Sequence, residues 1–133
     1  MATLFTKIIK GEIPCYKIAE DERYFAFLDI NPLMAGHTLV VPKVETDYIF
    51  DLPDAELSGL VLFSKKVAMA IEKAIPCVRI GVAVIGLEIP HVHIHLVPMN
   101  QMADINFKNP KLSFTPEEFT KIAKRISDKV GAV

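Results

Sequence analysis

The sequence carries almost no net charge. Fifteen lysines and arginines stand against sixteen aspartates and glutamates, which leaves a net charge of −1. Non-specific binding to nucleic acid or to an anionic membrane needs a basic surface, so neither partner is expected. A small anionic ligand remains compatible with this balance, because it needs only a few local donors.

Cysteines and long apolar runs are also scarce. The two cysteines, Cys15 and Cys77, are far apart and form neither a disulfide framework nor a zinc knuckle. We expect both to be buried, reduced thiols in a cytoplasmic protein. No apolar stretch is long enough to cross a bilayer, and the first residues do not have the pattern of a signal peptide.

The remaining composition predicts one folded domain over residues 1–133. Hydrophobic residues make up 51% of the chain and charged residues 23%, as in ordinary globular domains. The apolar pattern over 4–13 predicts a short helix that ends near Gly11, and apolar periodicity predicts a second helix at 54–75. A capping box at 115–118 starts a third helix. Alternating and β-branched runs predict strands at 15–19, 24–29, 37–42, 78–86 and 92–98. The polar stretch 99–112 is predicted to be a loop.

This order of elements predicts an α+β architecture. Strands that are neighbours in sequence favour a meandering antiparallel sheet of about five strands, packed with two main helices. A regular alternation of strand and helix is missing, and so are the glycine-rich sequences that cradle phosphates in Rossmann and P-loop folds. Both of those folds are therefore disfavoured.

Three of the four histidines alternate with aliphatic residues in the sequence His91-Val92-His93-Ile94-His95. Side chains on a strand alternate between its faces, so the three imidazoles are expected on one face and the aliphatic side chains on the other. The aliphatic face is expected to pack into the core. Unpaired imidazoles are costly in an apolar interior, so the imidazole face must meet polar groups.

Three interpretations of this strand remain open from the residues alone. It could be the polar outer face of a sheet. It could bind zinc through two histidines and a third ligand, for which Glu88 is the local carboxylate. It could also act as a nucleophile at phosphorus, since an imidazole with a pKa of about 6.5 is largely unprotonated near neutral pH. Neighbouring imidazoles could then orient the nucleophile and carry protons.

The segment 91–97 resembles the signature of the histidine triad (HIT) family, in which three histidines alternate with apolar residues. Further segments resemble the family in the same order, at 5–14, 25–32, 36–43, 54–75 and 86–98. The resemblance covers residues 3–98 and is closest to the Hint-type branch of small nucleotide-binding homodimers. The C-terminal loop and helix, 99–133, have no match. The resemblance implies a HIT-like fold.

The resemblance also implies a nucleotide hydrolase or nucleotidyl transferase that needs no metal or other cofactor. Its substrate would be a purine nucleoside phosphoramidate, a dinucleotide or another nucleotide conjugate, cleaved at the α-phosphate through a nucleotidyl-histidine intermediate. By resemblance, His93 is the nucleophile and His95 contacts the phosphate or the leaving group. His91 and His37 would orient the rings around them. A homodimer is expected.

The nucleoside is expected to bind beside these histidines. By resemblance, Asp29 binds the ribose, and a carboxylate can indeed accept two hydrogen bonds from a diol. Asp29 could alternatively serve only as a turn former before Asn31-Pro32. The base pocket would be lined by Phe5, Ile8, Phe27 and Ile30. Each of these four would otherwise be assigned to the core, and an apolar pocket implies loose base selectivity.

The sequence departs from the family where the phosphate should bind. Gly86-Leu87-Glu88 stands where the family has a glycine, a glutamine and a hydroxyl residue, and a carboxylate at Glu88 would repel a phosphate. Ile80 occupies the position expected for an asparagine, and Met99 that of an arginine. These losses keep two alternatives open: a nucleotide-binding module with little catalysis, and a metalloenzyme with histidine ligands.

Overall fold

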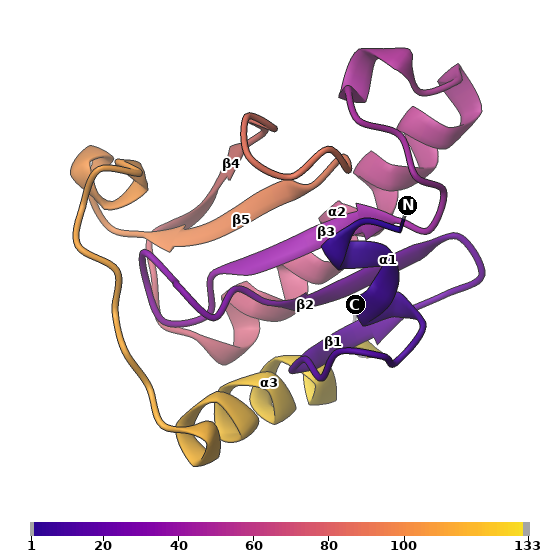
Figure 1. The fold of residues 1–133 in the computed structure, drawn as a ribbon. Coiled ribbons are helices and arrows are strands. Elements are labelled where there is room, and N and C mark those ends of the chain that lie inside the picture. The colour runs from indigo at the N-terminus through magenta and orange to yellow at the C-terminus, as the bar shows by residue number, and fades with distance from the viewer. Residues whose placement is uncertain (1, 132–133) are drawn as a thin grey trace.

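The computed structural model describes residues 2–131 as an antiparallel sheet with helices on both faces (Figure 1). The strands, in their order across the sheet, are β1 (Lys17–Glu20), β2 (Tyr24–Leu28), β3 (Thr38–Pro42), β5 (Ile94–Met99) and β4 (Arg79–Ala83). The helices are α1 (Leu4–Ile9), α2 (Asp54–Ala74) and α3 (Pro116–Val130). Two 3-10 turns, η1 (Ile49–Asp51) and η2 (Met102–Ile105), complete the fold.

The predicted α+β class with a five-stranded antiparallel sheet is confirmed, and each predicted strand is present to within a few residues. The strand order differs from a simple meander at one point. The connection through α2 takes β4 to the edge of the sheet, and β5 returns to pair with both β3 and β4. Burial explains why β5 is the inner strand and β4 the edge strand. β5 is buried almost throughout, whereas β4 is partly exposed and suits an edge.

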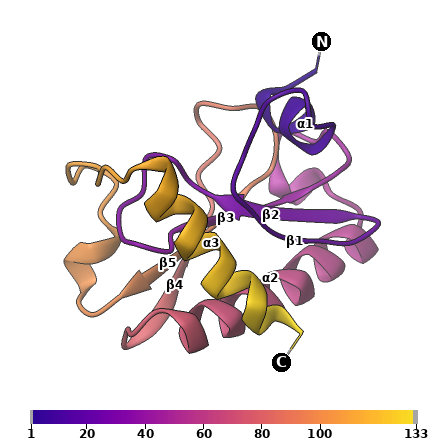
Figure 2. The ribbon, with the colours of Figure 1, turned by 90° about the horizontal axis from the view of Figure 1, so that it is seen from below.

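The main core lies between the sheet and the helices α2 and α3, which cover one face (Figure 2). As predicted, Val92, Ile94 and Leu96 pack into this core. The predicted capping box begins α3, because Thr115 Oγ1 accepts from the Glu118 N–H at 3.1 Å and Glu118 Oε1 accepts from the Thr115 N–H at 2.8 Å. Within residues 2–131, none of the helices combines the length and apolar character needed to cross a membrane.

A second, smaller core lies on the opposite face of the sheet, under α1. It consists of Phe5, Ile8, Phe25, Phe27, Leu39 and Val41. As predicted, the helix α1 ends just before Gly11, whose φ of +79° is in the left-handed region that glycine adopts easily. The strands β2 and β3 therefore separate two cores, and the smaller one adjoins the histidines.

Candidate functional site

A cavity of about 480 Å³ opens beside the smaller core. Every residue predicted for the site except His91 lines it: Phe5, Ile8, Phe27, Asp29, Ile30, His37, Glu88, His93 and His95. Phe5, Ile8 and Phe27 are also buried members of the smaller core, so they serve as core and as cavity wall at once. Ile30, by contrast, is 62% exposed at the rim.

His91 is fully buried behind the cavity and ties α1 to β3. Its Nε2 donates to the Pro42 carbonyl oxygen at 2.7 Å, so its Nδ1 is the unprotonated nitrogen and accepts from the Thr3 hydroxyl at 2.7 Å. Thr3 Oγ1 also caps α1 by accepting from the Thr6 N–H. Burial lowers the pKa of His91, although the Pro42 carbonyl and the Glu45 carboxylate oppose that shift. The ring is thus neutral and fixed in orientation.

His93 lines the cavity, and one of its two ring nitrogens is hydrogen-bonded to the backbone. Its Nδ1 lies 2.8 Å from the backbone carbonyl oxygen of His91. A carbonyl oxygen only accepts, so Nδ1 carries the proton and Nε2 of the neutral ring carries the lone pair. The ring meets Phe5 and His95 edge-on, each with a centroid distance of 5.0 Å. These contacts hold a nucleophilic or basic nitrogen in a fixed position.

His37 and His95 form a hydrogen-bonded pair whose proton positions also follow from their partners. The Leu33 N–H donates to His37 Nδ1 at 3.0 Å, so the proton of a neutral His37 is on Nε2. That Nε2 donates to His95 Nδ1 at 3.0 Å, which leaves the proton of His95 on Nε2. Burial lowers the pKa of His37 to about 3 and that of His95 to about 4, and the charge of a neighbouring histidine adds to each shift. Both rings are therefore neutral at neutral pH, and His95 Nε2–H is a donor.

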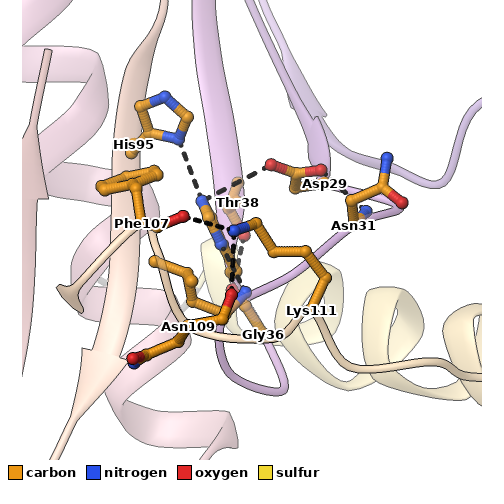
Figure 3. A network of polar contacts seen from close by, with 10 residues as sticks. Asp29, Asn31, Gly36, Thr38, His95, Phe107, Asn109 and Lys111 are labelled. Atoms are coloured by element: carbon orange, nitrogen blue, oxygen red, sulfur yellow. Dashed lines mark hydrogen bonds and ion pairs between the residues drawn. The ribbon is translucent and has the colours of Figure 1, made fainter. Parts of the chain in front are cut away.

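Asp29 lies just after β2, and its two carboxylate oxygens have different neighbours (Figure 3): one contacts a turn and the other the histidine pair. Oδ1 accepts from the Asn31 N–H at 2.8 Å, as expected of a turn-forming aspartate. Oδ2 lies 3.6 Å from His37 Nε2. Burial raises the pKa of Asp29, while the Asn31 N–H and the charges of His93 and Lys111 oppose that rise. Both interpretations of Asp29 are thus compatible with its position.

One group of three side chains within residues 2–131 has ligand atoms close enough to hold a metal ion. Asp29, His37 and His95 each offer one ligand atom, and these atoms lie within 4.8 Å of one another. A metal on His37 Nε2 would move the ring proton to Nδ1, where it would face the Leu33 N–H donor at 3.0 Å. This hydrogen bond opposes metal binding at His37 and favours the hydrogen-bonded pair.

The departures from the family pattern fall at different distances from the cavity. Glu88 lies in its wall and is exposed to solvent. Ile80 is paired with Pro98 and packs against the main core, and it is not part of the wall. The β4 residue that pairs with His95 is Ala83. The β4 position beside His95 therefore carries a methyl group and supplies no side-chain hydrogen-bond donor. It lies three residues after Ile80, the position at which the asparagine was expected.

Among the wall residues that the sequence did not identify, Phe107 and Lys111 come from the segment predicted to be a loop. Phe107 packs edge-on against His95, with ring centroids 4.8 Å apart, and also contacts His37 at 6.1 Å. Lys111, four residues later in the same segment, also lines the cavity. The segment also contains η2. No periodicity or motif marks these two residues in a polar stretch rich in asparagine and proline, so only the folded path of the chain identifies them.

Comparison with known proteins gives a consistent family. The HIT domain model matches residues 10–102. The adenosine 5′-monophosphoramidase hnt1 of Schizosaccharomyces pombe is 33% identical over 132 residues, which cover 98% of this chain and 99% of that protein. An uncharacterized HIT-like protein of Borreliella burgdorferi is also 33% identical, over 93% of this chain and 95% of its own.

Solved structures agree with the sequence comparison. A Hit-like protein involved in cell-cycle regulation from Bartonella henselae, crystallised with an unknown ligand, superposes with a TM-score of 0.84 at 30% identity, over 95% of this chain and 94% of that one. A zinc-bound histidine triad family protein from Mycobacterium smegmatis also gives 0.84, at 25% identity, over 99% and 95% of the two chains. The described chain therefore has the fold of these proteins.

Proposed function

The chain belongs to the HIT domain family, and from this premise we propose that it is a nucleotide hydrolase that cleaves a nucleoside phosphoramidate, a dinucleotide or another nucleotide conjugate at the α-phosphate. The adenosine 5′-monophosphoramidases among its relatives support a nucleotide hydrolase in general terms. The observation that carries the proposal is the hydrogen bond from His93 Nδ1 to the His91 carbonyl, which places the lone pair of a neutral His93 on Nε2 beside the cavity.

In the proposed reaction, His93 Nε2 attacks phosphorus. A nitrogen–phosphorus bond to His93 forms as the bond to the leaving group breaks, and an amine leaving group departs with a proton taken from water. Water then attacks the nucleotidyl-histidine, releases the nucleoside monophosphate and restores the free imidazole. The His95 Nε2–H is a suitable donor for the negative charge on a phosphate oxygen during both steps.

The proposed nucleoside subsite uses the cavity walls already described. Asp29 Oδ2, which lies 3.6 Å from His37, would accept a hydrogen bond from a ribose hydroxyl. The side chains of Phe5, Ile8, Phe27 and Ile30 would contact the base. Apolar contact distinguishes bases poorly, so we expect purine nucleotides to bind with little discrimination between them.

We further propose that residues 1–133 act as one HIT domain in a cytoplasmic homodimer. The described cysteines Cys15 and Cys77 are half-buried and unpaired, as a reducing compartment permits. The helix α2 exposes Val61 and Leu62, and the edge strand β4 exposes Val82, so both elements offer apolar surface to a second copy. No nucleic acid, membrane or cofactor enters the proposed reaction.

A nucleotide-binding module with little catalysis is the second candidate. It is favoured by Glu88, whose carboxylate lines the cavity, and by Ala83, which provides no donor beside His95. The histidine-ligated metalloenzyme is less well supported, because the Leu33 N–H holds His37 Nδ1 as an acceptor.

Hydrolysis of adenosine 5′-phosphoramidate tests the proposal. Wild-type protein should release AMP, and His93→Ala should lose at least about a thousandfold in rate, because the nucleophile is gone. The exposed Lys108→Met is a matched control and should retain wild-type activity. AMP binding without turnover of any conjugate would favour the binding module, and a His93→Ala variant as fast as wild type would rule out the mechanism.

A further inference from the structure

A positive charge in the cavity wall would strengthen the binding of a phosphate there. Its wall contains the carboxylates of Asp29 and Glu88, while burial keeps His37 and His95 neutral at neutral pH. Among the described residues of the wall, Lys111 is the one lysine or arginine. A nucleotide phosphate adds further negative charge, so the charge balance directs attention to Lys111.

The backbone around Lys111 is fixed between the loop that follows Asp29 and the histidine pair. The Leu112 N–H donates to the Pro32 carbonyl oxygen at 2.9 Å. Four residues before Lys111, the Phe107 ring packs against His95. Figure 3 shows the Lys111 side chain extending from this segment toward the side on which Phe107 and His95 lie. The fold therefore anchors the backbone on either side of Lys111, and the exposed Lys111 side chain extends from this anchored segment.

The Lys111 ammonium is bonded to backbone carbonyls of its own segment. Nζ donates to the carbonyl oxygens of Phe107, at 2.6 Å, and Asn109, at 3.1 Å (Figure 3). An ammonium has three N–H donors, so one remains beyond these two bonds. A charged phosphate oxygen is a stronger acceptor than a neutral carbonyl, and the flexible lysine stem allows the ammonium to reach it.

The charge of Lys111 acts on two groups of the cavity wall, Asp29 and His37. It lowers the pKa of Asp29, against the larger effect of burial, and it adds to the burial that lowers the pKa of His37. The charge of Lys111 therefore acts on the proposed ribose-binding acid and on the histidine pair. In the proposed complex, the phosphate would lie between the ribose at Asp29 and the nucleophile His93.

We infer that Lys111 binds the phosphate of the substrate and supplies the attraction that Glu88 and Ala83 do not. This inference rests on the proposed function, because it presumes that a nucleotide occupies the cavity. The competing account is that Lys111 only ties the segment 106–112 together through its two carbonyl bonds. The two accounts differ in whether the phosphate of the ligand matters.

Calorimetric binding of AMP and of adenosine distinguishes them. Lys111→Met should weaken AMP binding by about tenfold or more, because a charge-assisted hydrogen bond is lost, and should leave adenosine binding within about twofold. Lys111→Gln keeps an N–H donor for the carbonyls but not the charge, and it should behave like Lys111→Met. Lys111→Arg should retain most of the AMP affinity, and Lys108→Met should match wild type.

Three outcomes would overturn the inference. In the first, Lys111→Met and Lys111→Gln bind AMP as tightly as wild type. In the second, they lose AMP and adenosine affinity equally, which would assign Lys111 to the shape of the segment alone. In the third, wild-type protein binds neither ligand, and the proposed function fails with it. The melting temperatures of all variants verify that they fold. In Lys111→Met and Lys111→Gln, AMP affinity should depend less on salt than in wild type.

Discussion

The Nδ1 atom of His93 lies 2.8 Å from the carbonyl oxygen of His91, two residues earlier in the chain. The side chain of His91 is itself held by Pro42 and Thr3, so the carbonyl that orients His93 belongs to a fixed residue. The two histidines thus have different tasks. His91 holds the backbone in place, and His93 presents Nε2 to the cavity.

Replacing His37 tests the hydrogen-bonded pair. In His37→Gln, His95 loses the ring that donates to its Nδ1 at 3.0 Å, so the orientation and proton position of His95 are no longer fixed. We expect kcat for adenosine 5′-phosphoramidate to fall by about tenfold to a hundredfold, with a smaller change in KM, because misplaced catalytic groups cost on this scale. Steady-state kinetics measures both constants. An unchanged kcat would show that His95 acts without this partner.

Replacing Asp29 tests ribose recognition. Asp29→Asn keeps an oxygen for the Asn31 N–H but loses the second acceptor that the ribose diol needs. Wild type should prefer AMP to 2′-deoxy-AMP by about tenfold, and the variant should lose most of that preference. Calorimetry with both ligands gives the ratio, and Asp51→Asn in the exposed turn η1 is the matched control. A preference that survives in Asp29→Asn would assign Asp29 to the turn alone.

The buried histidine pair predicts a stability that falls with acid. The unfolded chain protonates His37 and His95 below a pKa of about 6.5, whereas the folded chain keeps them neutral until their pKa values of about 3 and about 4. Between those values the unfolded state binds more protons, so stability is lost as pH falls. We expect a loss of about 3 kcal/mol in the free energy of unfolding from pH 7 to pH 5.

Urea unfolding at several pH values measures this loss. The His37→Gln variant is the control, because it lacks one of the two groups and should show a shallower dependence on pH. A wild-type stability that stays constant from pH 7 to pH 5 would mean that the two imidazoles do not resist protonation in the folded state.

The periodic segments of the sequence predicted most of the fold. The alternation at 91–95 correctly assigned Val92 and Ile94 to the main core, because a strand exposes alternate residues to opposite faces. The same alternation predicted that the three histidines share one face of a single strand. In the structure β5 begins only at Ile94, and the ring of His91 turns behind the cavity to Pro42.

Other features of the site depend on contacts between distant parts of the chain. The proton positions of His37 follow from the Leu33 N–H and His95, and no sequence pattern specifies the first of these. Phe107 and Lys111 enter the wall because an aperiodic segment after β5 folds back over the histidines. Hydrophobic periodicity carries no information about such a path, so these residues become visible only in three dimensions.

Mass spectrometry of the reacting enzyme detects whether His93 Nε2 forms the proposed nucleotidyl intermediate. Wild-type protein mixed with adenosine 5′-phosphoramidate is quenched at mildly alkaline pH, where a phosphorus–nitrogen bond to histidine survives, and is then digested. We expect a peptide that is heavier by one adenylyl group on His93 and that is absent from the His93→Ala variant. Turnover with the adenylyl group on another residue, or undiminished turnover by His93→Ala, would contradict the proposal.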